Sequence, residues 1–191
     1  MKRLFLIAGL MTAFMLVVLA ASAQNKANFG GTWSLDKTKS QSLTGQLQNA
    51  EKVTWTIKQD DKTISIDQKV EGAQPQAGGG PGGGGGGGGM GGGRGMGGGM
   101  AGPTAYNLDG TETTSDIGGG QMTGKASLKA TWSGNTLELV RKSTFNGPNG
   151  EVTSTNSRKL SLSGDGKVLT AVVHNESPRG TTDSTLVFSK Q

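Results

Sequence analysis

Few side chains in this sequence are suited to catalysis or to metal binding. His174 is the only histidine of the 191 residues, the chain has no cysteine, and no G-x-S-x-G segment is present. A hydrolytic triad needs a base that is oriented by a carboxylate, and a zinc site needs several histidine or cysteine ligands. The sequence therefore predicts a protein that is not an enzyme and that carries no metal and no cofactor.

Two arginines are candidates for binding, because each continues a strand face that is otherwise apolar. Arg141 continues the face of Leu137–Leu139, and Arg158 continues the face of Leu160–Leu162. If these faces point inward, both guanidinium groups look into the protein or line its rim. A buried arginine needs an anionic partner, either an internal carboxylate or an acidic ligand such as a fatty acid head group. The alternative is that both arginines lie at strand ends in solvent.

The segments that would position these residues are predicted to be β-strands, because apolar and polar residues alternate along most of the chain. Val53, Trp55 and Ile57 share one face, and Asp60-Asp61 separates them from the next alternating run, which indicates a tight hairpin. Beyond the N-terminal region no window keeps a helical period, and residues 36–50 hold at most one short helical turn. The fold class is therefore all-β.

The spacing of the turns predicts how the strands are connected. Turn residues recur about every 8–12 residues, which joins neighbouring strands by short loops and predicts an antiparallel meander. A meander of about 8–10 strands removes its exposed edges most simply by closing into an up-and-down β-barrel. A two-sheet sandwich is the alternative, since strands with one apolar and one polar face suit both architectures.

Two segments fall outside the strand pattern. Residues 1–23 have the features of a secretory signal peptide, an apolar run that ends in the cleavage site Ala21-Ser22-Ala23, so the mature chain would begin at Gln24. Of the 25 residues from 78 to 102, 19 are glycine, which leaves nothing to bury and predicts a disordered loop insert. Residues 24–191 are thus predicted to form a single β-barrel domain that the insert 78–102 interrupts.

The predicted compartment and the net charge limit the partners. A cleaved signal peptide without a lipidation cysteine places the protein in the periplasm or outside the cell, with no membrane span after cleavage. The mature chain keeps 17 basic and 14 acidic residues, a net charge of +3, and its basic residues are scattered. This distribution argues against nucleic-acid binding. The protein is expected to be a monomer.

Two short motifs resemble a known family. The segment Asn28–Trp33, "NFGGTW", is similar to the G-x-W signature that opens the first strand of lipocalins. The segments "GTWSLDKTKS" at 31–40 and "LSLSGDGKVLT" at 160–170 resemble those of small exported lipocalin-like bacterial proteins, a mostly uncharacterised family. The resemblance implies a lipocalin-like barrel in which Trp33 lies across the closed end. It also implies that a basic residue near the last strand, Lys190 or Arg179, packs over Trp33.

The leading functional prediction is an exported non-enzymatic β-barrel that binds a small apolar or amphipathic molecule. Its partner would then be a small lipophilic ligand. The alternative is a structural or interaction module of the cell envelope, with an envelope protein as its partner and no small-molecule ligand. The candidate ligand-binding residues are those expected on the inner face of the barrel: Trp33, Trp55, Ile57, Leu128, Leu139, Arg141 and Arg158.

Overall fold

The structure is a computed structural model that describes residues 26–72, 105–119, 122–147 and 150–191. The predicted signal peptide 1–23 and the glycine-rich insert 78–102 lie outside these ranges, so both remain predictions. In the described ranges, no helix is both long enough and apolar enough to span a membrane.

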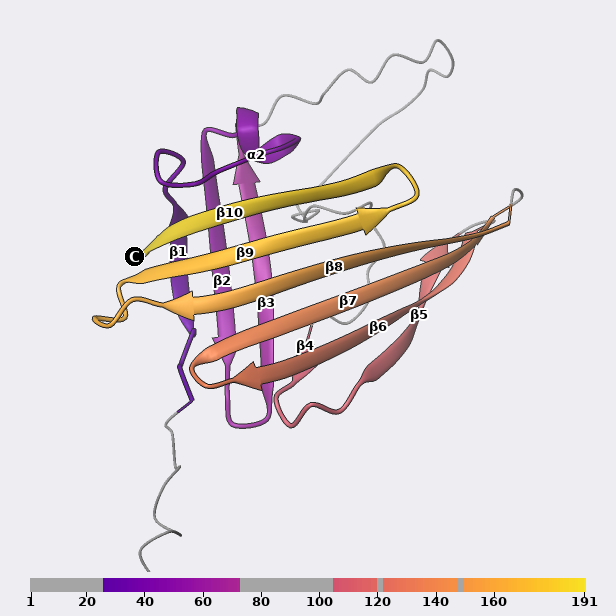
Figure 1. Cartoon of the computed structure of the whole chain (residues 1–191), viewed down its shortest axis with the longest axis horizontal. Coiled ribbons are helices and arrows are strands. Elements are labelled where there is room, and N and C mark those ends of the chain that lie inside the picture. The colour runs from indigo at the N-terminus through magenta and orange to yellow at the C-terminus, as the bar shows by residue number, and fades with distance from the viewer. Residues whose placement is uncertain (1–25, 73–104, 120–121, 148–149) are drawn as a thin grey trace, which may run out of the picture.

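The described residues form one sheet of ten antiparallel strands and one short helix (Figure 1). Strands that are consecutive in sequence pair with each other, and β1 also pairs with β10, so the order is β4-β3-β2-β1-β10-β9-β8-β7-β6-β5. The elements are β1 (Gly31–Leu35), α2 (Gln46–Asn49), β2 (Lys52–Gln59), β3 (Thr63–Glu71), β4 (Ala105–Asn107), β5 (Thr113–Gly119), β6 (Met122–Ser133), β7 (Thr136–Gly147), β8 (Gly150–Leu162), β9 (Val168–Ser177) and β10 (Gly180–Lys190).

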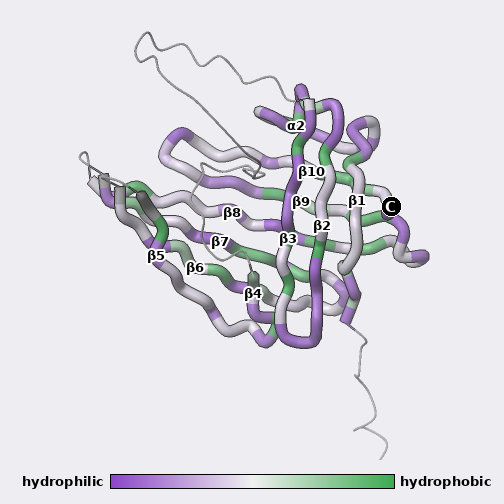
Figure 2. The backbone as a smooth tube through the Cα atoms, turned by 180° about the vertical axis from the view of Figure 1, so that it is seen from behind, coloured by the Kyte–Doolittle hydropathy of each residue, from purple (hydrophilic) through white to green (hydrophobic). Residues whose placement is uncertain are grey.

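The sheet curls into a nearly closed barrel. Its edge strands β4 and β5 are consecutive in sequence, so the short loop between them brings the two edges together. Across this seam, Nδ2 of Asn107 donates a hydrogen bond to Oγ1 of Thr113 at 3.0 Å. Figures 1 and 2 show β1–β4 as one wall, with the longer strands β6–β10 crossing it as the other. The predicted all-β, up-and-down barrel is confirmed, with ten strands in the described part of the chain.

The hairpin predicted around Asp60-Asp61 is present between β2 and β3. Oδ1 of Asp60 accepts hydrogen bonds from the backbone N–H of Lys62 at 2.8 Å and of Thr63 at 2.7 Å, which fixes the turn between β2 and β3. Val53, Trp55 and Ile57 all point to the interior and are at most 3% exposed.

The connection between β1 and β2 folds over the end of the barrel at which β2 begins. The short helix α2 inserts Leu47 into the core, where it is buried. Nζ of Lys37 donates to the backbone oxygens of Gln48 at 2.8 Å and Ala50 at 3.0 Å, so it occupies the free carbonyls at the C-terminus of α2. The helical turn expected within residues 36–50 is thus present.

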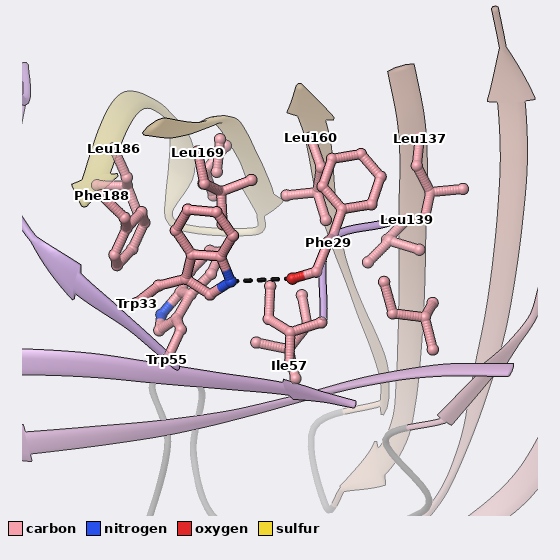
Figure 3. Close-up of a cluster of buried hydrophobic side chains, with 14 of the residues drawn as sticks. Phe29, Trp33, Trp55, Ile57, Leu137, Leu139, Leu160, Leu169, Leu186 and Phe188 are labelled. Atoms are coloured by element: carbon pink, nitrogen blue, oxygen red, sulfur yellow. Dashed lines mark hydrogen bonds between the residues drawn. The ribbon is translucent and has the colours of Figure 1, made fainter. Parts of the chain in front are cut away.

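The hydrophobic core fills the barrel on the side where β1 begins and β10 ends. Side chains from both walls meet there, and many are completely buried (Figure 3). Two aromatic pairs lie within this core: Trp55 with Phe188, with ring centroids 4.3 Å apart, and Phe29 with Trp132 at 6.0 Å. Because the chain has no cysteine and therefore no disulfide, this core contributes much of the stability of the barrel.

Candidate functional site

Trp33 closes one end of the barrel. Its side chain is 0% exposed, and its indole Nε1 donates a hydrogen bond to the backbone oxygen of Phe29 at 2.9 Å (Figure 3). The amide of Gln59 holds the same segment, since it accepts from the backbone N–H of Phe29 at 2.8 Å and donates to the backbone oxygen of Ala27 at 3.0 Å. These hydrogen bonds fix the segment that precedes β1 across the end of the barrel at which β1 begins. We call this end of the barrel the closed end.

The basic residue expected over Trp33 is Lys190. Its Nζ lies 5.2 Å from the centroid of the Trp33 ring, whereas Arg179 lies in the turn between β9 and β10. Gly31 makes room for this contact, because a Cβ at that position would lie 3.1 Å from Cε of Lys190. The φ of Gly31 is 135°, a conformation that other residues rarely adopt. The G-x-W segment thus needs its glycine for both backbone conformation and space.

Four of the other candidate residues are core residues. Trp55, Ile57, Leu128 and Leu139 are at most 3% exposed and belong to the same hydrophobic cluster as Trp33. They line the interior, as expected, but they are packed against other side chains of this chain. A ligand role for these four residues stays a prediction.

Both candidate arginines face the interior. Arg158 is opposite Leu139 on β7 and Val173 on β9, and both of these neighbours are buried. Its guanidinium carbon lies 5.5 Å from the centroid of the Trp55 ring on β2. Because β2 and β8 are not adjacent in the sheet, this contact crosses the inside of the barrel. Arg141 is opposite Leu128 on one side and Asn156 on the other, and it is partly buried.

The environment of Arg158 is poor in negative charge. Burial lowers the pKa of Arg158, the phenol of Tyr106 opposes this shift, and the nearby positive charge of Arg141 adds to it. Its Nε donates to Oδ1 of Asn156 at 3.0 Å, and Nδ2 of Asn156 donates in turn to Oδ1 of Asn175. Within the described residues, the ion pairs involve Asp36, Glu71 and Asp183, and none of them includes Arg158. The internal carboxylate considered as its partner is therefore not found there.

The sequence did not single out two further inward side chains, one that contacts Trp55 and one that lies close to Arg158. Gln68 lies in phase with Ile64 and Ile66 on β3, and its Oε1 accepts a hydrogen bond from Nε1 of Trp55 at 2.8 Å. Tyr106 on β4 is 7% exposed, and burial raises the pKa of its phenol, although the nearby arginines oppose that shift. A polar residue in phase with apolar strand neighbours is the signal that would have identified Gln68.

The inner surface of the barrel changes character along the strands. Near the closed end the inward side chains are apolar and fully buried, whereas further along the same strands they are polar and partly exposed. Figure 2 shows this change in β8–β10, which are most hydrophobic near the C-terminus. We call these inward polar residues the polar half: Gln68, Ser115, Arg141, Ser143, Ser154, Asn156, Arg158 and Asn175.

His174 lies outside the barrel, on the outer face of β9. Its Nδ1 is 2.6 Å from Oδ1 of Asp183 on β10, and Ser157 is its register neighbour on β8. Among the described residues, the side-chain partner of His174 is Asp183, and no hydrogen bond joins His174 to Ser157. The described residues also contain no cluster of three or more histidine, cysteine or acidic side chains suited to a metal ion.

No protein-family model matches this sequence, and comparisons with curated proteins and with solved structures find no significant match. The class is therefore defined by architecture alone: an up-and-down antiparallel β-barrel, nearly closed, with an apolar core at one end and a polar half beyond it.

Proposed function

We propose that this chain is an exported, non-enzymatic β-barrel that binds a small amphipathic molecule in its polar half. The supporting observation is the partial exposure of inward-facing polar side chains on β3, β5, β7, β8 and β9. Inward residues of a filled barrel are buried, as they are near the closed end. The partial exposure of the inward-facing residues Arg141, Asn156 and Asn175 supports access by a small molecule.

The walls of the polar half suit a molecule with two kinds of surface. On one side lie apolar residues of the β2–β3 pair, Val53 and Val70. On the other side lie the polar residues of β7–β9. Binding sites combine apolar walls with a few fixed polar groups, so an amphipathic ligand fits better than a purely apolar one.

A structural module without a ligand is the alternative, and one observation favours it. Trp33, Trp55 and Leu139, which were candidates for lining a cavity, are at most 1% exposed and belong to the packed core. In this alternative the interior of the barrel binds no ligand, and its outer surface contacts an envelope protein. The two functions differ in whether the polar half is occupied in the native protein.

Native mass spectrometry of protein purified from its own envelope tests the proposal. We expect a mature chain that begins at Gln24 and a noncovalent adduct of low mass that is lost on denaturation. A chain that retains Met1 would contradict export. A matched pair of variants locates the adduct, because Ser154→Trp fills the polar half while Thr155→Trp places the same ring on the outer face of β8.

The expected result is loss of the adduct in Ser154→Trp and its retention in Thr155→Trp. An adduct that survives in Ser154→Trp would lie outside the barrel and would contradict the proposed site. A bare protein, whose melting temperature no amphiphile raises, would favour the structural module instead.

A further inference from the structure

We propose that the polar half receives the carboxylate group of its ligand between Arg158 and Gln68, beside the indole of Trp55. This inference rests on the proposed function and specifies the chemical class of the ligand: a small acid whose head group enters first. Two contacts define the position. The Arg158 guanidinium carbon is 5.5 Å from the Trp55 ring centroid, and Oε1 of Gln68 is 2.8 Å from Nε1 of Trp55.

The orientation of the Gln68 amide follows from the chemistry of tryptophan. The indole Nε1–H is only a donor, so the amide group that meets it must be the oxygen. The amino group Nε2 then points away from Trp55, and it is buried without a hydrogen-bond partner among the described residues. A buried donor without an acceptor is unfavourable, and an acceptor atom of a ligand would remove that cost.

Hydrogen bonds within the barrel also position the guanidinium group of Arg158. Its Nε is occupied by Oδ1 of Asn156 at 3.0 Å, and Asn156 is itself fixed by Asn175. The two terminal nitrogens of the guanidinium form no hydrogen bond to any residue that the structure describes. No ion pair of the described residues includes Arg158, and the planar pair of N–H groups on its guanidinium matches the two oxygens of a carboxylate.

The groups nearby add further donors and supply no carboxylate. Arg141 and Tyr106 both lie close enough to change the pKa of Arg158, whereas no carboxylate of the described residues does so. Ser115 on β5 is also inward-facing, and its Oγ is buried without a partner in the described part of the chain. The charge of this region is therefore positive, and its unmet hydrogen-bonding capacity is mainly that of donors. These properties select an anionic acceptor over a neutral alcohol or a cation.

The depth of the site determines how the ligand lies. Arg158 is at the boundary of the filled core, since its register neighbours Leu139 and Val173 are buried. The head group therefore stops at this level, and the rest of the molecule extends away from the closed end along the polar half.

Isothermal titration with three amphiphiles of equal chain length tests the inference: decanoate, decanol and decyl phosphate. We expect decanoate to bind the wild-type protein at least about tenfold more tightly than decanol, because charge-assisted hydrogen bonds to a buried head group are worth that much. The decisive variant is Gln68→Glu. Its carboxylate still accepts from Trp55, but it brings a permanent counter-ion to Arg158 and should abolish decanoate binding.

The matched control is Ser65→Glu, which places the same charge on the outer face of β3. Decanoate binding that is lost in Gln68→Glu and unchanged in Ser65→Glu supports the inference. Equal affinity for decanoate and decanol, tighter binding of decyl phosphate, or full binding by Gln68→Glu would each overturn it while leaving an amphiphile-binding barrel. If none of the three amphiphiles binds the wild-type protein, the proposed function itself fails.

Discussion

Lys190 lies directly opposite Trp33 in the β1–β10 ladder and holds its ammonium group 5.2 Å from the centroid of the indole ring. The contact joins the first strand of the barrel to the last at the closed end. It also accounts for the glycine of the opening motif, because any side chain at Gly31 would meet the stem of Lys190.

Removing the charge of Lys190 should therefore destabilise the barrel slightly. Lys190→Met keeps most of the apolar stem but loses the cation–π interaction, which at an exposed position is worth about 0.5–1 kcal/mol. Lys190→Arg keeps the charge and should stay close to wild type. Urea unfolding of both variants, with Lys129→Met on an exposed outer position as control, measures the difference. Equal losses in Lys190→Met and Lys129→Met would show that the ring contact contributes nothing.

Trp33 should contribute much more than its lysine partner. Trp33→Ala removes a fully buried ring and its hydrogen bond to Phe29, which should cost about 3–5 kcal/mol. Trp33→Phe keeps most of the apolar volume but leaves the Phe29 oxygen without its donor, so we expect a smaller loss of about 1–3 kcal/mol. Denaturant unfolding monitored by circular dichroism gives both values. A Trp33→Ala protein within about 0.5 kcal/mol of wild type would contradict the role of this residue as a plug.

Acid should weaken the loop that follows β1. A hydrogen bond from the Thr38 hydroxyl, followed by one from Lys39, lowers the pKa of Asp36 to about 2. Because this folded-state pKa lies below that of an unfolded aspartate, the contribution of Asp36 is complete above about pH 4 and is lost as the pH falls toward the folded value. Wild type should thus exceed Asp36→Asn in stability at neutral pH, and the gap should close near pH 2. A gap that does not vary between pH 7 and pH 2.5 would contradict this assignment.

The connection between β3 and β4 should tolerate a large deletion. Ser65 pairs with Ala105, so the chain must return from Glu71 along six residues of β3, roughly 20 Å. Replacing residues 78–102 by a four-residue turn leaves a linker of about 12 residues, which reaches about 40 Å when extended. The melting temperature should change by no more than a few degrees, since closure entropy varies slowly with length. A shortened protein that fails to fold would show that the glycine-rich segment contributes to the structure.

The sequence predicted those parts of the barrel whose strands alternate strongly. The faces of Val53, Trp55 and Ile57, the turn at Asp60 and the role of Trp33 all depend on residues close together in the chain. Strand β5 has only a weak signal in the sequence, because Ile117 is strongly apolar among its inward side chains whereas Thr113 and Ser115 are polar.

The candidate site was only half predictable for a different reason. The inward phase of Arg141 and Arg158 was visible from their strand neighbours. That Arg158 would lie over Trp55, beside Gln68, depends on how β8 and β2 face each other across the barrel, with three strands between them in the sheet. No local pattern contains that information, since it results from the curvature of the whole sheet.

The seam between β4 and β5 has a consequence for the way the barrel fluctuates. β4 pairs only with the first three residues of β3, so from Ile66 onward β3 is paired on one side by β2 and, within the described ranges, by no strand on its other side. Local opening should therefore begin at this line, where few backbone hydrogen bonds must break, and should meet most resistance at the long β7–β8 ladder. The rate of amide hydrogen exchange should then vary from strand to strand, with the slowest amides in β7 and β8 and the fastest in β4 and β5. A barrel with such a gradient can admit a molecule through its side wall while the closed end beneath Trp33 stays intact.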